Sequence, residues 1–222
     1  MPLPALAAVA GLAAAAHLGR RGSAAKVYQN NRKRMLDLIW RGLASEARAL
    51  AKELGSNKVD LSEANLSGID LSGKDLSGFI FILTDLSGAN LHKANLSMSD
   101  LTEANLNGAN LQEANMHGSD LSLASLRNAN MKKTNLRNSD LSAAILSNAD
   151  LSESDLFGAS LNSAEMDGTN INGANLQNAR IRFVDEIDFG PGRVFTGIPS
   201  GFIKIESHFV PGRSTLRRRG VN

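Results

Sequence analysis

An apolar residue occupies every fifth position of this chain from Leu61 to Ile181. The 25 consecutive units keep one phase, and the central residue of each is Leu, Met, Ile or Phe. Two residues before the centre lies Ala, Ser or Thr in 21 of the 25 units, and Asp or Asn directly precedes the centre in 19 of them. The consensus of the unit is therefore Ala, then Asp or Asn, then Leu-Ser-Gly.

A period of five residues matches neither an α-helix nor a flat β-strand. A short repeat of fixed period indicates a solenoid, in which each unit buries its apolar residue by stacking on copies of itself. Units such as Ala104-Asn105-Leu106-Asn107-Gly108 resemble the pentapeptide-repeat family, and the resemblance covers about 125 of the 222 residues. It implies a mainly β fold: a right-handed quadrilateral parallel β-helix with four units per coil, one on each face. Such a solenoid would have about six coils and a length of about 30 Å.

The repeat divides the chain into four parts. These are an apolar Ala-rich segment (1–25), an amphipathic capping helix (26–57), the β-helix (58–182), and a C-terminal cap with an irregular basic tail (183–222). The net charge of the whole chain is +2, but residues 1–57 carry +6, residues 58–182 carry −6 and residues 183–222 carry +2. We therefore expect an acidic rod between basic ends.

The first segment allows three interpretations. Residues Leu3 to Leu18 are almost all apolar, and Arg20 and Arg21 follow directly. A membrane anchor or membrane-embedded helix is the preferred one, although a full span needs about 20 apolar residues. Basic residues after an anchor would place the solenoid on the cytoplasmic side or its topological equivalent. Alternatively, the segment is a removable targeting sequence, leaving a soluble cytoplasmic or organellar protein, or an Ala-rich helix packed on protein.

Residues Lys26 to Leu54 have the pattern of one helix with a single apolar stripe, and Gly55 is a suitable stop. We expect this helix to cover the open N-terminal end of the solenoid, which would otherwise expose unpaired backbone and the Leu column. The alternative is an amphipathic helix on anionic lipid. The candidate lipid contacts from both N-terminal segments are Arg20, Arg21, Arg32, Lys33, Arg34 and Trp40.

Four units per coil sort the repeat into four faces. Face one has the centres 61, 81, 101, 121, 141 and 161; faces two, three and four have the centres five, ten and fifteen residues later. The residue two positions after the centre is Gly or Asn on nearly every coil of faces two and four, which predicts type II-like corners there and a different corner on the other faces. Face three stacks Lys93, Glu113, Lys133 and Glu153, which predicts a ladder of opposite charges.

Face one differs from the others. From residue 59 to residue 163 it carries a charge of −6 and no Lys or Arg, whereas the other faces carry −2, −1 and 0. It also has apolar residues at positions that should point outward. We predict a partner-binding surface made of Ile80, Ile82, Leu83, Asp100, Glu103, Asp120, Leu123 and Asp140. The alternatives are that the Asp side chains bond the local turns, that Ile82 and Leu83 meet the N-terminal helix, or that face one has simply drifted from the consensus.

After Ile181 the repeat ends. Residues 183–189 could form a strand over the last coil, and residues 193–198 and 201–210 could be short strands or loops between Gly- and Pro-containing turns. The basic sequence Arg217-Arg218-Arg219 is expected to be disordered.

The sequence contains no sign of catalysis. It has no Cys, its four His are scattered without metal-ligand spacing, and it has neither a phosphate-binding loop nor a nucleophile elbow. We therefore predict a protein that is not an enzyme, with no cofactor and no metal site.

These features favour an interaction or scaffold protein that binds a basic protein partner on face one and is tethered to a membrane by its N-terminus. The pentapeptide-repeat family also includes proteins that resemble B-form DNA and bind DNA gyrase, so a DNA mimic acting on gyrase is an alternative. A third possibility is a structural subunit of a large membrane complex. Direct binding of nucleic acid is not expected.

Overall fold

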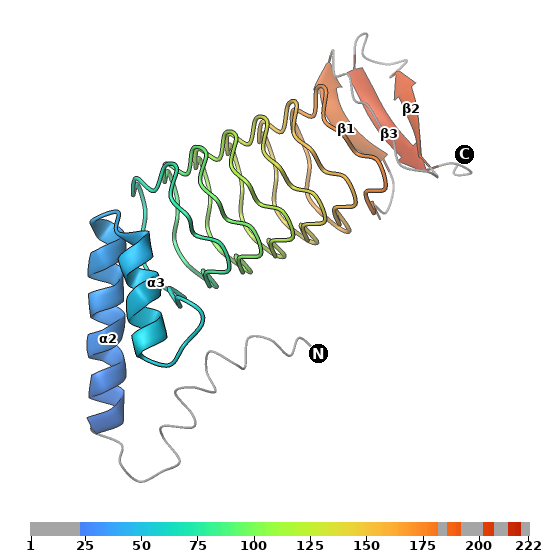
Figure 1. Cartoon of the computed structure of the whole chain (residues 1–222). Coiled ribbons are helices and arrows are strands. Elements are labelled where there is room, and N and C mark those ends of the chain that lie inside the picture. Colours follow the sequence, from blue (N-terminus) through green and yellow to red (C-terminus); the bar gives the residue numbers. More distant parts are fainter. Residues whose placement is uncertain (1–22, 182–185, 192–201, 207–212, 219–222) are drawn as a thin grey trace.

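The computed structural model describes residues 23–181, 186–191, 202–206 and 213–218, with side chains from Lys26 to Ile181. Two helices, α2 (Ser23–Trp40) and α3 (Ala44–Glu53), lie at one end of an extended solenoid (Figure 1). A small β-sheet lies at the other end. The apolar segment with Arg20 and Arg21 lies outside the described residues, so its three interpretations remain open.

Parallel backbone bridges join residues that are 20 positions apart throughout the solenoid. One such ladder runs Asp60, Ile80, Asp100, Asp120, Asp140, Ser160, Arg180. Within it, the Leu61 amide donates to the carbonyl of Ile80 at 2.8 Å, and the Ile80 amide donates to the carbonyl of Val59 at 2.9 Å. The same bonding repeats in the three ladders that start at Asn65, Asp70 and Asp75. The solenoid is therefore a parallel β-helix with four units per coil, as the repeat predicts.

The core consists of two kinds of inward-pointing residue. The centre residues stack into columns that are fully buried, as at Leu101 and Leu121, and the small residues two positions earlier are buried beside them. Polar small residues satisfy their hydroxyls inside the coil: Thr84 Oγ1, for example, donates to the carbonyl of Leu61 at 2.8 Å. The coil is narrow, so one large and one small residue per unit fill it.

The corners correct one prediction from the sequence. All 24 residues two positions after a centre, from Glu63 to Asn178, have a positive φ between 55° and 70°. Each corner is closed by a hydrogen bond such as that from the Ala64 amide to the Leu61 carbonyl at 3.1 Å. The expectation of a different corner on faces one and three was wrong, because the 20-residue closure demands the same turn on every face. Residues such as Leu83 and Leu123 therefore adopt a left-handed conformation that Gly or Asn tolerates better.

We expect Leu123→Asn to raise the free energy of unfolding by about 0.5–1 kcal/mol, because Asn adopts the left-handed conformation at a lower cost than Leu does. Chemical denaturation of the purified protein measures this change. Ser87→Asn is the control, since Ser87 lies one position after a centre and is not among the positive-φ residues. A loss of stability in Leu123→Asn would show that the Leu side chain contributes to the fold.

The N-terminal helix predicted from Lys26 to Leu54 is two helices. The Leu43 amide donates to the carbonyl of Leu38 at 2.8 Å and the Gly42 amide to that of Ile39 at 2.8 Å, which ends α2 in a Schellman motif with Gly42 at φ 69°. Gly42 could have indicated this break in the sequence. The break was not predicted, because the apolar stripe continues past Gly42. Gly55, with φ 80°, ends α3 in the same way, as predicted.

The two helices close the N-terminal end of the solenoid. Met35 and Ile39 of α2 and Ala47 and Ala51 of α3 are buried in one continuous core with the first coils. Side chains of both helices therefore lie over the apolar column of the first coils, the position in which we expect a cap.

Two arginines replace the backbone donors that a preceding coil would supply. In the second coil the carbonyl of Ser97 accepts the amide of Gly78; the equivalent carbonyl in the first coil, that of Ser77, accepts Arg48 Nη2 of α3 at 3.0 Å. Arg32 of α2 donates to the carbonyl of Ser62 in the same manner on face one. Arg48 also lies 4.8 Å from the ring centroid of Phe79. The cap therefore satisfies edge carbonyls as well as covering the apolar column.

The C-terminal part is more regular than the sequence suggested. The strands β1 (Glu186–Pro191), β2 (Phe202–Glu206) and β3 (Arg213–Arg218) form an antiparallel sheet in the order β1-β3-β2. The strands β1 and β2 overlap the ranges 183–189 and 201–210, where the sequence allowed short strands. The disorder expected for the basic end was wrong for Arg217 and Arg218, because both lie in β3, and Arg217 pairs with Glu186 and Ile203. The expected segment 193–198 lies outside the described residues.

Candidate protein-binding surface

Face one presents a column of carboxylates. Asp100, Asp120 and Asp140 are bridged neighbours in three successive coils. The Oδ1 atom of each accepts the amide of the residue two positions later, at 3.1, 2.9 and 2.9 Å. The predicted alternative, in which these Asp side chains bond their own turns, is therefore part of the structure. It does not explain why the residues are Asp, because Asn accepts the same bond.

On faces three and four, Asn side chains in the equivalent column are joined by hydrogen bonds between adjacent coils. On face three, the side-chain amide of Asn90 donates to Asp70 at 3.0 Å, and Asn110 donates to Asn90 at 3.2 Å. On face four, Asn115 and Asn135 donate down the column at 3.0 and 2.9 Å. Carboxylates cannot donate, so the three Asp of face one gain no such bond and repel one another.

The corner of face one alternates acidic and apolar side chains. Successive coils place Glu63, Leu83, Glu103 and Leu123 at this corner. Leu83 is 50% exposed and Leu123 is 54% exposed, although both are large apolar residues. Exposed Leu at strained corners contributes nothing to the fold that we can identify.

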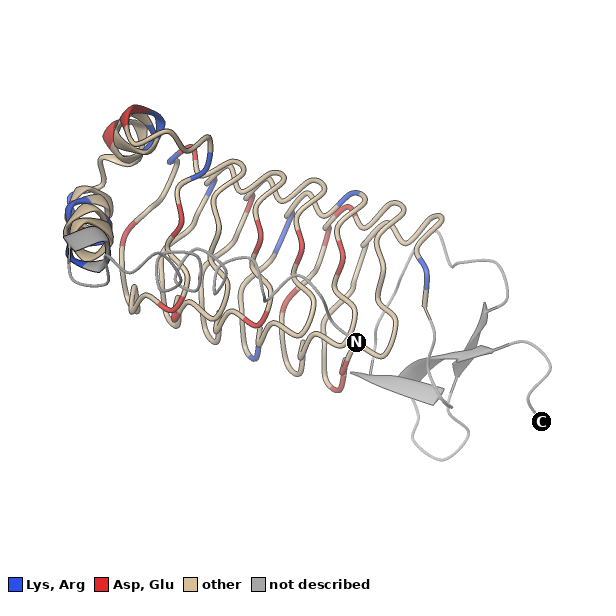
Figure 2. Ribbon diagram, turned by 90° about the horizontal axis from the view of Figure 1, so that it is seen from below, with Lys and Arg blue, Asp and Glu red and all other residues tan. Residues whose placement is uncertain are grey.

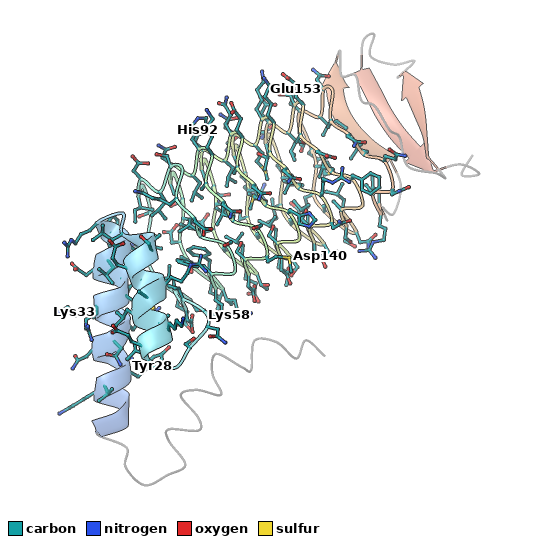
Figure 3. The ribbon with its side chains drawn as sticks, viewed as in Figure 1. Tyr28, Lys33, Lys58, His92, Asp140 and Glu153 are labelled. Atoms are coloured by element: carbon teal, nitrogen blue, oxygen red, sulfur yellow. The ribbon has the colours of Figure 1, made fainter. Side chains whose placement is uncertain are left out.

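The structure brings the eight predicted residues onto one side of the solenoid. Ile80 and Ile82 are partly buried in the second coil, next to exposed Leu83. The helix α2 reaches face one at Ser62, one coil earlier, through Arg32, and leaves Leu83 half exposed. Figure 3 shows Asp140 on the side of the solenoid away from His92 and Glu153, which belong to face three.

Face three carries the predicted charge ladder in part. Lys93 pairs with Glu113 and Lys133 with Glu153, both at 3.5 Å, while Lys132 adds a contact to Glu153 at 3.2 Å. The hydrogen bond and charge of Lys132, with Lys133, lower the pKa of the Glu153 carboxyl. The predicted Glu113–Lys133 rung is not among the ion pairs of the described residues. Figure 2 shows Asp and Glu recurring along the solenoid. The units of face three also contain Lys93, Lys132 and Lys133, whereas those of face one contain no Lys or Arg from residue 59 to residue 163.

The candidate lipid contacts on α2 separate into two groups. Arg32 is engaged with the carbonyl of Ser62, whereas Lys33, Arg34 and Trp40 are exposed, Trp40 at 52%. Positions 33 and 40 are seven residues apart and therefore lie on the same side of the helix. None of the helices within the described ranges is long and apolar enough to cross a membrane.

The sequence analysis missed a groove at the N-terminal end. It has a volume of about 690 Å³ and is bounded by α2, the end of α3 and the start of the first coil. Tyr28 lies in it, and burial, together with the charges of Asp60 and Glu63, raises the pKa of its hydroxyl. Two apolar residues at the start of α2, Val27 and Tyr28, could have indicated this groove; both are exposed in the structure.

The described part of the chain contains no candidate metal centre. No group of three or more His, Asp or Glu side chains in residues 26–181 is arranged to hold a metal ion. The polar residues instead serve the turns and the Asn ladders.

The chain belongs to the pentapeptide-repeat family, whose model, "Pentapeptide repeats", matches eight copies over segments that together span residues 60–182. No curated protein matches the chain. Among solved structures it is similar to QnrB1, described as a plasmid-mediated fluoroquinolone resistance protein, with 23% identity over 56% of this chain and 70% of QnrB1, and a TM-score of 0.44.

Two cyanobacterial proteins are also similar. HetL, involved in heterocyst differentiation regulation in Nostoc sp. strain PCC 7120, is 31% identical over 55% of this chain and 60% of HetL, with a TM-score of 0.26. Rfr23 from Cyanothece 51142 is 23% identical over 63% of this chain and all of Rfr23, with a TM-score of 0.34. These similarities concern the repeat and do not identify a partner.

We expect Asp120→Asn to raise the free energy of unfolding by about 0.5–1 kcal/mol at low salt, because it removes two like-charge contacts and adds a donor to the column. The gain should shrink as salt screens the remaining charges. Denaturation at low and high ionic strength measures both effects. Asp150→Asn is the control, because Asp150 has Asn130 and Asn170 as its ladder neighbours. Equal changes in the two variants would remove the argument for repulsion on face one.

Proposed function

We propose that this protein is a non-enzymatic scaffold that binds a basic protein on face one. The observation that carries the proposal is the stack of Asp100, Asp120 and Asp140 beside half-exposed Leu83 and Leu123. Asn in the column and Gly at the corner would serve the fold better, and both occur at the equivalent positions of other faces. Residues that cost stability in one contiguous surface are typical of a binding site.

The geometry defines the chemistry of the partner. Each carboxylate uses one oxygen for its own turn and can accept further hydrogen bonds at the other, which suits Arg or Lys. Leu83 and Leu123 are two coils apart, which is about 10 Å, and this distance matches two turns of a helix. We therefore expect a partner segment with two apolar residues at that separation and basic residues between them.

Photo-crosslinking in the native host tests this proposal. A photoreactive amino acid at position 83 or 123 should give a discrete product with one protein, whereas the same amino acid at position 113 should not. Glu113 is the matched control, because it occupies the same left-handed corner on face three with φ 58°. The product should disappear in an Asp100→Lys/Asp120→Lys background, because charge reversal repels a basic partner.

Equal products from positions 83 and 113 would contradict the proposal. So would a product that survives the charge reversal, or a cross-linked protein whose surface is not basic. If the product is a subunit of DNA gyrase, the DNA-mimic alternative gains support, and added full chain should then inhibit supercoiling by purified gyrase. No inhibition at high excess would exclude that alternative.

The N-terminal region carries a second candidate role. We propose that residues 1–57 tether the solenoid to a membrane or a large membrane complex, with the outward side of α2 as the described point of contact. The observation in favour is that Lys33 and Trp40 are exposed on one side of α2 and that Arg34, the next residue after Lys33, is exposed as well, since basic residues and Trp suit an anionic lipid surface.

Trp40 is the single Trp of the chain, so its fluorescence reports on this contact directly. We expect its emission to shift to shorter wavelength when vesicles containing phosphatidylserine are added, and not with vesicles of phosphatidylcholine alone. Lys33→Gln/Arg34→Gln should weaken the shift, while Lys93→Gln, on the solenoid, should not. An unchanged spectrum with anionic vesicles would rule out lipid contact by this side of α2.

A further inference from the structure

The groove at the N-terminal end borders the line of corners on face one. Within the solenoid, each corner amide of this face donates to a carbonyl of the next coil, as the Glu63 amide does to that of Ile82 at 2.8 Å. The carbonyl of Ser62 lies in the first coil and accepts Arg32 of α2 instead. The guanidinium group of Arg32 therefore lies where the corner amide of a coil before Glu63 would lie, and Arg32 lines the groove.

The groove continues this line of corners with apolar side chains. Its walls include Val27 and Tyr28 of α2 and Leu54 at the end of α3, which are 57%, 42% and 43% exposed. Its volume of about 690 Å³ is in the range of pockets that bind ligands. Figure 3 labels Tyr28 and Lys58, which both line the groove.

Acidic residues of the first coil lie at the mouth of the groove. Asp60 lines it, and burial, together with the charges of Asp60 and Glu63, raises the pKa of the Tyr28 hydroxyl, which indicates that both carboxylates lie near this side chain. Along the corner, the order is therefore the apolar groove, then Glu63, Leu83, Glu103 and Leu123, with about 4.8 Å between successive coils. The alternation of acidic and apolar positions thus has three apolar positions when the groove is included.

We propose that the groove is the N-terminal end of the surface on face one, and that it binds a third apolar residue of the same basic partner segment. This inference rests on the function proposed above. The groove and Leu83 are two steps apart, as are Leu83 and Leu123, and each interval of about 10 Å equals about seven residues of an α-helix. The partner segment is then a helix along the solenoid with three apolar residues at this spacing and Lys or Arg between them, opposite Glu63 and Glu103.

Charge and continuity favour this occupant. The formal charges of Arg32 and Lys58 in the groove balance those of Asp60 and Glu63 beside it, so the groove suits an apolar side chain better than an ionic head group. Beyond the groove, face one has no Lys or Arg up to residue 163, so the excess of negative charge begins where the basic residues of the segment would lie. A helix placed on the two exposed Leu residues reaches the groove because all three apolar positions follow one line of corners.

Photo-crosslinking of the full chain in the native host tests the inference. With the photoreactive amino acid at position 27, we expect a product with the same protein that positions 83 and 123 capture. Mass spectrometry of the products should place the attached residues at intervals of about seven within one basic segment, with the residue captured from position 83 in the middle. Lys33 is the matched control, because it is exposed on the same helix and does not line the groove. The same amino acid at position 33 should not capture that segment.

A charge reversal at the mouth of the groove tests the basic character of the segment. We expect Glu63→Lys to lower the yield of the product at position 27 by about tenfold, because it places a like charge opposite a basic residue of the partner. Glu53→Lys changes the net charge equally, and Glu53 is exposed without lining the groove, so this control should leave the yield unchanged. The circular dichroism of both variants should match that of the natural sequence.

A product at position 83 without one at position 27 would overturn this inference and leave the proposed function intact. A product at position 27 with lipid, with another protein or with a distant segment of the same protein would do the same. Equal yields in Glu63→Lys and Glu53→Lys would show that the groove does not receive a basic segment. The absence of products at positions 83 and 123 would contradict the proposed function and this inference together.

Discussion

The structure depends on the return of the backbone to the same place every 20 residues. Amide and carbonyl groups pair between residues of adjacent coils, as between Leu61 and Ile80, so every coil is a template for the next. A narrow interior then admits one large and one small side chain per unit, and each of the four corners must reverse in the same way. The cost is carried locally by residues such as Leu123 and Glu103, which adopt a conformation that Gly would adopt freely.

The same pairing makes the ends of the solenoid a problem, because the first coil has no preceding coil to satisfy its carbonyls. Arg32 and Arg48 satisfy two of these carbonyls, since their guanidinium groups donate to the carbonyls of Ser62 and Ser77. The helices α2 and α3 solve it physically by covering the apolar column with Met35, Ile39 and Ala47. A basic N-terminal region is therefore in part a structural feature of the cap, beyond any role at a lipid surface.

The fixed five-residue period made a solenoid predictable, and the resemblance to the pentapeptide-repeat family implied its four faces. The break between α2 and α3 was missed, since Gly42 interrupts the backbone without interrupting the apolar stripe. The sequence allowed short strands near β1 and β2, but β3 and the sheet were missed, because the pairing of Arg213–Arg218 with two distant strands leaves no local pattern. The uniform corner conformation was missed because the prediction used the residue type at one position. The closure of the whole coil determines that conformation more strongly than the residue type does.

For the binding surface, the sequence showed which residues share face one, and the structure adds why they are unusual there. Asp120 could be Asn, as Asn110 is on face three, and Leu123 could be Gly, as Gly108 is on face two, without loss of any hydrogen bond described at these positions. The acidic charge and the exposed Leu residues define the chemistry of the proposed partner. We propose that the arrangement reflects a conflict between folding and another requirement.

The most direct test of that conflict is the free energy of unfolding of a protein in which face one is returned to the consensus, with Leu83→Gly, Asp100→Asn, Asp120→Asn, Leu123→Gly and Asp140→Asn combined. Our account predicts that this protein is more stable than the natural sequence, because repulsion and corner strain are both relieved. A less stable protein would contradict the account, since it would mean that the acidic and apolar residues of face one serve the fold itself.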